Sequence, residues 1–349
     1  MSGSSRSASS AVDKASPWAE FKPPLFIVGS ARSGTNLLYD TLLSSGEFAN
    51  YRTEPVVFDL LVPKFGDLSR RRNRVRLLSV WLRSYQFYLS GLERDFIAPR
   101  VLNDCNNAGD FIVLVMNEIA RRQGVSRWAV WGPDNLLHMS AIASTIPTAQ
   151  FIHLIRDGRD VALSLTKKSF IRPFPWDRAR AHALVVAGLH WKWKVERGRE
   201  LSRALKDRYL EVRFEDLVLN PRKTLTQIST FIGRNLDYDL IQRKSIGTLI
   251  SPNSAYRGPD GKFVSEPVER WRTYLSRPEI AQLESACGPL LGKLGYALEF
   301  PARRPQTLAL KAMNQLYPTF FSLKEWLRSK TPLGRFVNTN RLRFDAVPR

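Results

Sequence analysis

The clearest chemical signature is a run of small residues around one arginine, Gly29-Ser30-Ala31-Arg32-Ser33-Gly34. The apolar residues before it, Leu25–Val28, predict a short buried strand, and the apolar spacing after Thr35 predicts a helix. A glycine-bounded loop between a strand and a helix gathers backbone N–H groups at the positive end of the helix, where anions bind, phosphate most often. The segment therefore predicts an anion site.

The spacing of the two glycines matches the first six positions of a Walker A loop, but Thr35-Asn36 stands where that motif has Lys-Ser/Thr. We therefore expect the phosphate cradle without the nucleoside triphosphate chemistry. Arg32 supplies a cation, and a guanidinium can hold two oxygens of a phosphate or sulfate at once. A turn of the same shape that binds nothing is the alternative interpretation.

A second anion site is indicated by Arg156 and Ser164 in the run Arg-Asp-Gly-Arg-Asp-Val-Ala-Leu-Ser. The almost wholly apolar Gln150–Ile155 before it predicts a central strand of a parallel sheet. Arg156 would stand at the carboxyl end of that strand, where ligands of open α/β sheets bind. Ser164 would lie two turns into the next helix, so a bent ligand could contact both residues.

With both motifs in this order, the chain resembles the sulfotransferases that use 3′-phosphoadenosine 5′-phosphosulfate (PAPS), from about Leu25 to Glu299. Arg213-Phe-Glu-Asp-Leu217 and Trp271-Arg272 are similar to later parts of that family. The resemblance implies that Arg32 is also catalytic, because it would neutralise charge on the sulfuryl group as it is transferred. It implies the following residues as contacts of the co-substrate PAPS: Ser30, Arg32, Ser33, Gly34, Thr35, Asn36, Arg156, Ser164 and Arg257.

The acceptor hydroxyl or amine needs a general base. Glu54 is the candidate, because relatives often carry a glutamate shortly after the first helix. An ion pair with a nearby arginine is the alternative role for Glu54, and His138 and His153 are the other candidate bases. One departure concerns Asp134, which stands where many relatives have a lysine near the sulfuryl group. Either another cation replaces that lysine, or the acceptor chemistry differs, or activity is weak.

The spacing of strand and helix patterns predicts one α/β domain with a central parallel sheet and helices on both faces. Strands are expected at the start of the anion loop, within 50–58, and over 128–132, 150–155 and 209–214. We expect a disordered Ser/Ala-rich tail over 1–20, a P-loop-like sulfotransferase domain over 21–300 with a helical insertion at about 64–122, and a basic extension over 301–349.

The formal net charge of +21 favours anionic partners but does not choose among them. The basic run Arg70–Arg76 is interpreted either as a solvated helix face or as a rim that attracts an acidic acceptor, and the second interpretation favours an acidic or membrane-surface glycan. Carbohydrate, glycolipid, small alcohol and peptide tyrosine all stay open as acceptors, and no specific nucleic acid is expected. Two distant cysteines, Cys105 and Cys287, fit a reducing compartment, so we expect a cytoplasmic protein. No spacing of His or Cys suggests a metal site.

The C-terminal extension carries ten Lys and Arg against two acidic residues, and an aromatic patch around Phe320, Phe321 and Trp326. Two interpretations stay open. The segment contacts an anionic membrane surface peripherally, or its aromatic residues pack on the catalytic domain. Two other functions also compete with sulfuryl transfer: a P-loop kinase or NTPase, and a non-catalytic nucleotide-binding relative.

Overall fold

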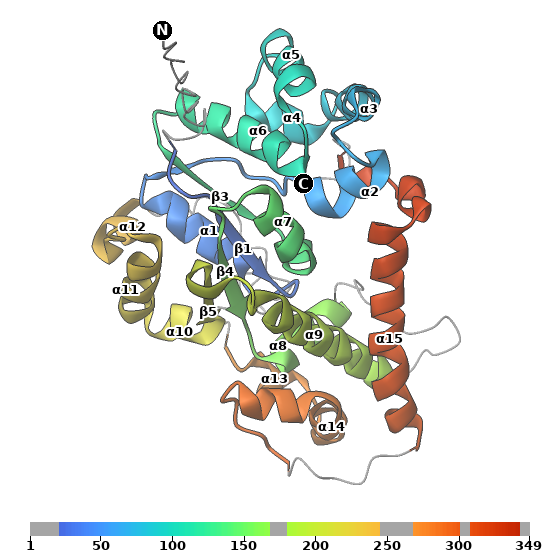
Figure 1. The fold of residues 1–349 in the computed structure, drawn as a ribbon. Coiled ribbons are helices and arrows are strands. Elements are labelled where there is room, and N and C mark those ends of the chain that lie inside the picture. The colour runs from blue at the N-terminus through green and yellow to red at the C-terminus, as the bar shows by residue number, and fades with distance from the viewer. Residues whose placement is uncertain (1–20, 168–179, 245–267, 301–307, 343–349) are drawn as a thin grey trace, which may run out of the picture.

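The computed structural model describes residues 21–167, 180–244, 268–300 and 308–342 of the 349-residue chain. The tail over 1–20 and Arg257 with its loop lie outside these residues. At the centre is a five-stranded sheet in the order β2-β3-β1-β4-β5, with every pair parallel (Figure 1). The predicted parallel α/β architecture is confirmed. The strands are β1 (Leu25–Gly29), β2 (Phe48–Ala49), β3 (Arg127–Trp131), β4 (Gln150–Ile155) and β5 (Tyr209–Arg213).

Alternate residues of β1 enter two different cores, so helices cover both faces of the sheet. Phe26 and Val28 pack on one side, and Leu25 and Ile27 on the other. The first side is covered by η1 (Val57–Leu61), α6 (Ala108–Arg122), η2 (Pro133–His138) and α7 (Met139–Thr145). The second side is covered by α1 (Thr35–Ser44), α10 (Phe214–Leu219), α11 (Pro221–Ile232) and α12 (Tyr238–Lys244).

The expected strand within 50–58 is wrong, because no residue of that span lies in a strand. Strand β2 ends at Ala49, and η1, a π-helix, begins at Val57. Val56 adopts a left-handed φ of 46°, which ends the extended chain. All residues of η1 are buried against the helical layer, so this run lacks the alternation that a half-buried strand shows.

A group of helices between η1 and β3 forms the top of the molecule in Figure 1. They are α2 (Val62–Phe65), α3 (Arg71–Trp81), α4 (Tyr85–Ser90), α5 (Arg94–Asp104) and α6. The basic run contributes to their packing, because the buried Arg74 donates to the carbonyls of Leu68 at 2.6 Å and Leu102 at 3.0 Å. Its neighbours Arg71 and Arg72 are exposed.

The opposite end of the sheet carries a third core. It contains α8 (Gly158–Lys167), α9 (Arg180–Ser202), α13 (Arg270–Tyr274) and α14 (Arg277–Lys293), with Trp191 and Trp271 fully buried. Helix α14 begins with a capping box formed by Ser276 and Glu279. The short η3 (Lys206–Arg208) leads into β5.

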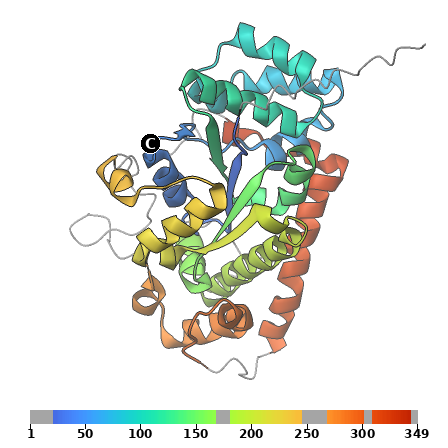
Figure 2. The same ribbon diagram turned by 60° about the vertical axis from the view of Figure 1, so that its left-hand side comes forward.

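The C-terminal segment is one long helix, α15 (Leu308–Lys330), followed by the turns η5 (Pro332–Phe336) and η6 (Asn340–Leu342). Figures 1 and 2 show α15 running along the side of the body beside α9. Tyr317 and Phe321 are buried against α9, whereas Phe320 and Trp326 are 42% and 54% exposed. The aromatic residues of this segment are therefore partly packed on α9 and partly exposed. Within the described residues, no helix has the length and apolar character that a membrane span requires.

Candidate functional site

The loop from Gly29 to Gly34 is shaped by close packing at both of its glycines. A Cβ on Gly29 would lie 2.5 Å from the Leu154 carbonyl oxygen, and one on Gly34 would lie 2.4 Å from the Phe214 ring. Gly34 also has a φ of 93°, in the left-handed region that favours glycine. The chain thus turns tightly from β1 into α1, with the first helical N–H groups facing the loop, as expected for a nest.

Arg32 itself has a φ of 72°, which is uncommon for a residue with a side chain. Strained backbone of this kind is kept where the surroundings enforce it, and it clusters at functional sites. The Arg32 Nε donates to the Ser164 hydroxyl at 2.9 Å, and the Arg156 guanidinium donates to the Arg32 carbonyl at 3.1 Å. The structure thus brings the two predicted anion motifs, more than a hundred residues apart, into direct contact.

The second motif contains two arginines, and the structure separates their roles. Arg159 is 2% exposed and forms ion pairs with Asp157 at 2.7 Å and Glu284 at 2.6 Å, so it ties the turn to α14. Arg156 instead reaches the first loop, with its guanidinium 4.6 Å from the centre of the Phe214 ring and 3.4 Å from Asp160. Of the two arginines, Arg156 is therefore the one that contacts the first loop.

Other residues that were predicted to bind PAPS lie in the same loop or at the start of α1. Ser30 and Ser33 are fully buried, and neither hydroxyl has a hydrogen-bond partner among the described residues. Buried hydroxyls normally have a hydrogen-bond partner, so two exceptions in one loop are consistent with an anion-binding loop. Thr35 is buried and Asn36 half-buried at the start of α1.

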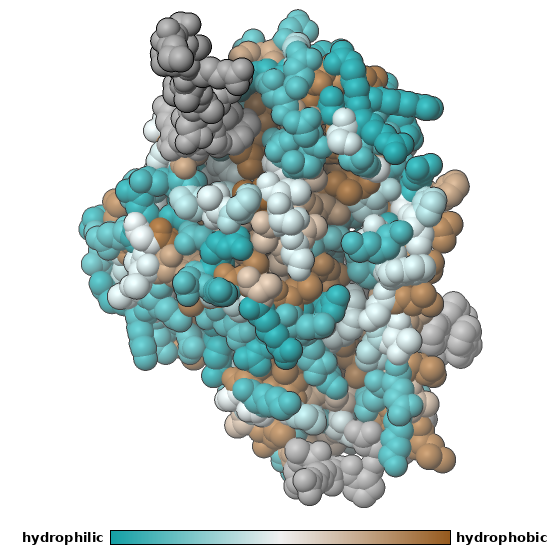
Figure 3. Space-filling model, in the orientation of Figure 1, coloured by the Kyte–Doolittle hydropathy of each residue, from teal (hydrophilic) through white to brown (hydrophobic). Residues whose placement is uncertain are grey.

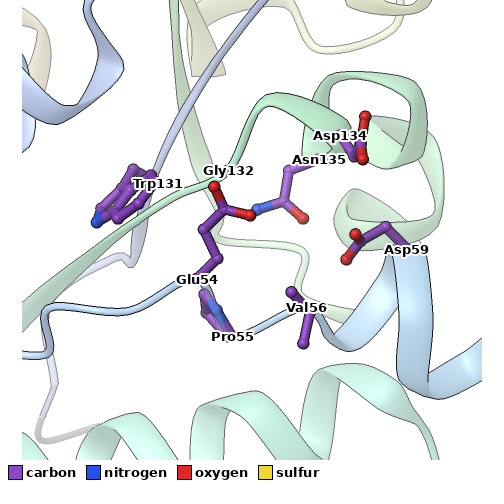
Figure 4. A pocket seen from close by; sticks show the side chains of 8 residues that line it. All are labelled: Glu54, Pro55, Val56, Asp59, Trp131, Gly132, Asp134 and Asn135. Carbon is purple, nitrogen blue, oxygen red and sulfur yellow. The ribbon is translucent and has the colours of Figure 1, made fainter. Parts of the chain in front are cut away.

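A small pocket lies at the carboxyl end of β3, lined by Glu54, Pro55, Val56, Asp59, Trp131, Gly132, Asp134 and Asn135 (Figure 4). Glu54 extends from the segment after β2 toward Gly132 and Asn135, while Asp59 and Asp134 lie at the other end of the pocket. The Gly132 N–H donates to the Ile27 carbonyl at 3.4 Å, which places this pocket beside the end of β1. The anion loop and the pocket therefore occupy the same edge of the sheet.

Glu54 is held by a cation from the far end of the chain. Its carboxylate accepts a hydrogen bond from Arg341, whose guanidinium also pairs with Asp59 at 2.6 Å. Burial raises the pKa of Glu54 to about 7; Asp59 and Asp134 add to this, and Arg341 opposes it. Burial also raises the pKa of Asp59. A carboxylate with a pKa near 7 suits a general base at neutral pH.

Asp134 is paired with a buried cation that the sequence did not reveal. The Lys194 Nζ of α9 lies 2.6 Å from Asp134 and 3.2 Å from the Pro133 carbonyl. The charges of Lys194 and Arg328 outweigh burial and hold the pKa of Asp134 well below its usual range. Asp134, the residue that departs from the family resemblance, thus lines the pocket and is paired with a lysine from α9.

The two histidines considered as bases lie in packed surroundings. His153 is fully buried in β4, its Nδ1 2.6 Å from the Tyr209 hydroxyl, and burial lowers its pKa to about 4. His138 lies beside Glu325 of α15 at 3.6 Å, and burial, with Arg328, lowers its pKa to about 4. Neither lines the pocket, whereas Glu54 does.

The comparisons with known proteins agree with these features. A family model described as "Sulfotransferase family" matches residues 23–238, well over half of the chain. This chain belongs to the sulfotransferase family. Carbohydrate sulfotransferase 7 of Mus musculus is 34% identical over 98 residues, and carbohydrate sulfotransferase 1 of Homo sapiens is 32% identical over 95 residues. These alignments span 26% and 27% of this sulfotransferase and only 19% and 23% of the curated relatives.

Solved structures share the fold of this sulfotransferase. The sulfotransferase domain of the olefin synthase of Synechococcus PCC 7002 has a TM-score of 0.52 at 20% identity, covering 80% of this chain and 96% of that domain. The sulfotransferase domain from the curacin biosynthetic pathway has a TM-score of 0.51 at 15% identity, with coverages of 80% and 100%. The P-loop-like α/β fold expected from the two motifs is confirmed.

Proposed function

We propose that the protein transfers a sulfuryl group from PAPS to a hydroxyl of a carbohydrate acceptor. The observation that supports this most strongly is the contact between the two anion motifs, through Arg32, Ser164 and Arg156. PAPS carries anionic groups at both ends of one nucleotide, so it needs two anion sites that meet. A nucleoside triphosphate has no 3′-phosphate and needs only the first site.

The chain's own residues divide the work on the donor. Backbone N–H groups of the first loop, with Thr35 and Asn36, would bind the 5′-phosphosulfate at the positive end of α1. Arg156 and Ser164 would bind the 3′-phosphate, and Arg257 would be a further contact. Arg32, already near Ser164, would neutralise the charge that develops on the sulfuryl oxygens and the departing phosphate.

The acceptor step would use Glu54 as general base. The acceptor oxygen attacks the sulfur, the bond from sulfur to the bridging phosphate oxygen breaks, and 3′-phosphoadenosine 5′-phosphate (PAP) leaves. The hydroxyl proton passes to the Glu54 carboxylate, whose pKa of about 7 allows it to accept that proton at neutral pH. Lys194 is the cation nearest to Asp134, and we propose that it replaces the lysine of other family members.

The polar lining of the pocket favours a carbohydrate over an apolar alcohol. It includes the side chains of Glu54, Asp59, Asp134 and Asn135, whereas the Trp131 ring packs beside Tyr39 on the α1 side of the sheet. Carboxylate and amide oxygens accept hydroxyl protons, and a sugar offers several of them. The names of the curated relatives support the same class.

Turnover of sulfur-35-labelled PAPS on a panel of sugars, sugar amines, tyrosine peptides and alkyl alcohols tests the proposal. We expect labelled product with a sugar hydroxyl. Turnover of ATP–Mg²⁺ instead would support a P-loop kinase, and donor binding without product on any acceptor would support a non-catalytic relative.

We also infer a peripheral contact between α15 and an anionic membrane surface. The outward face of the helix exposes Leu316, Phe320, Leu323 and Trp326, and the exposed Lys311, Lys324 and Lys330 lie on the same helix. Apolar surface is visible along this edge of the molecule in Figure 3. Glu325, the one acidic residue of α15, is paired with Arg328 at 2.7 Å. Apolar and cationic side chains together favour anionic lipid. The cytoplasmic location expected from the cysteines stays a prediction; both thiols are buried.

A further inference from the structure

Arg341 belongs to the C-terminal segment, but its side chain lies at the pocket that Glu54 and Asp59 line. Its guanidinium donates to Glu54, pairs with Asp59 at 2.6 Å, and lies 3.8 Å from Asp134. These three acidic residues all line the pocket proposed for the acceptor. One side chain from the last turn of the described chain thus touches every carboxylate there.

The segment that carries Arg341 is fixed to the body at several points. The Gln86 side chain donates to the Arg341 carbonyl at 2.9 Å, and the Lys64 ammonium donates to the Val337 carbonyl at 3.0 Å. Leu342 is 3% exposed and belongs to the core that includes Phe58 of η1. Anchors on both sides of Arg341 hold its side chain over the pocket, so its position does not depend on one surface ion pair.

We propose that Arg341 is a positioning residue of the acceptor site, which holds the Glu54 carboxylate ionised and oriented toward the acceptor. This inference rests on the proposed function of Glu54 as general base. The C-terminal segment, which the sequence suggested was an extension, would then complete the active site.

The charges around Glu54 explain why its carboxylate needs Arg341. Asp59 approaches from η1 and Asp134 from η2, so two negative charges disfavour its ionisation, and burial acts in the same direction. Arg341 is the cation that opposes them directly. The other cations of the cluster, Lys194 of α9 and Arg328 of α15, act on Asp134, and Arg328 also on Asp59. Without Arg341, Glu54 would keep its proton to higher pH.

The pH dependence of turnover in two variants of the full-length chain tests this. Arg341→Gln removes the positive charge and should move the acidic limb of kcat/KM upward by about one pH unit, which is about a tenfold loss at pH 6, with recovery above pH 9. Asp59→Asn removes a negative charge and should move the limb downward. Arg341→Lys keeps the charge and should restore much of the wild-type profile. Arg335→Gln, an exposed arginine in the same segment, is the matched control and should leave the profile unchanged.

A readout without turnover separates this inference from the proposed function. In protein with carboxyl carbon-13 glutamate, the Glu54 signal is assigned by its loss in Glu54→Gln, and its titration is followed directly. We expect a midpoint that rises in Arg341→Gln and falls in Asp59→Asn, even if no acceptor is ever turned over. Unchanged midpoints in both variants would overturn the inference. Higher turnover of Arg341→Gln at every pH would also overturn it, because Arg341 would then be inhibitory.

Discussion

Replacing Arg32 and Arg156 separately should damage two different steps, because the structure gives them different surroundings. Arg156 lies against Phe214 and Asp160 and donates to the Arg32 carbonyl of the anion loop. Its proposed ligand, the 3′-phosphate, does not change charge during transfer. A hydrogen bond to a charged group contributes about 1.5–3 kcal/mol, so Arg156→Ala should weaken PAP binding about 10- to 150-fold with little effect on kcat.

Arg32 would stabilise charge while the bond to sulfur breaks, so its loss should lower kcat. Removing one preorganised group that stabilises a developing anion costs about 10²–10³ in kcat, and we expect Arg32→Ala to lie in that range with a smaller effect on PAP binding. Alanine at a φ of 72° adds strain. Arg32→Gly is therefore the matched control, since glycine adopts this φ freely.

Calorimetric titration with PAP gives the dissociation constants, and labelled PAPS at saturating concentration gives kcat. Equal losses in Arg32→Gly and Arg32→Ala would assign the effect to the side chain. If Arg156→Ala lost turnover with unchanged binding, or if both arginines affected binding and turnover alike, the division of roles between the two loops would be refuted.

Three further predictions concern Glu54 and α15. Because burial raises the pKa of Glu54 to about 7, turnover should rise with pH through 7, and the stability that the protonated carboxyl contributes should be lost over the same pH rise. Glu54→Gln should therefore melt at a higher temperature than wild type at pH 8 but not at pH 4.5. Equal differences in melting temperature at both pH values would contradict this. Replacing Phe320 and Trp326 together by alanine should reduce co-sedimentation with anionic vesicles by roughly tenfold or more, without lowering the melting temperature. The control Leu37→Ala, on the exposed surface of α1, should co-sediment like wild type. Equal vesicle binding by the double variant and the control would exclude the membrane contact. Phe321→Ala should lower the free energy of unfolding by about 3–5 kcal/mol and Phe320→Ala by less than about 0.5 kcal/mol, because Phe321 is buried on α9 and Phe320 is exposed. Similar losses for the two variants in urea unfolding would disprove that packing.

The two anion motifs could be predicted from the sequence because their signal is local. Each consists of a buried strand, a turn and a helix start within a few residues, and the residue types indicate an anionic ligand. The same strands gave the fold, since β4 and β5 lie within a residue of where the apolar patterns placed them. The direct contact between Arg32 and Ser164 follows from parallel pairing of β1 with β4, which brings their carboxyl ends to one edge.

The pocket proposed for the acceptor was less predictable, because only the tertiary fold brings its residues together. Asp59 lies in η1, which begins inside the span where a strand and its loop were expected. Lys194 is one polar residue in a long helix, and Arg341 is one of ten cations in the C-terminal segment. Nothing in their local spacing distinguishes them from solvated charges. Asp134, at the position where many relatives have a lysine, was the one available signal, because a partly buried carboxylate needs a cationic partner.

The same packing changes how the C-terminal segment should be studied. Truncation after Pro301 would remove Tyr317 and Phe321, which belong to a core, together with Arg341, which contacts Glu54 in the pocket proposed for the acceptor. Loss of stability or turnover in such a protein would not distinguish packing from membrane contact. Single substitutions on the outward and inward faces of α15 make that distinction.

Binding of PAP compared with adenosine 5′-monophosphate, without Mg²⁺, tests most directly the claim that two anion sites hold one nucleotide. The two ligands differ only in the 3′-phosphate. We expect PAP to bind at least tenfold more tightly, to raise the melting temperature by mass action, and to lose this advantage in Arg156→Ala. Equal affinity for the two nucleotides, or stabilisation by ATP–Mg²⁺ and not by PAP, would contradict the account.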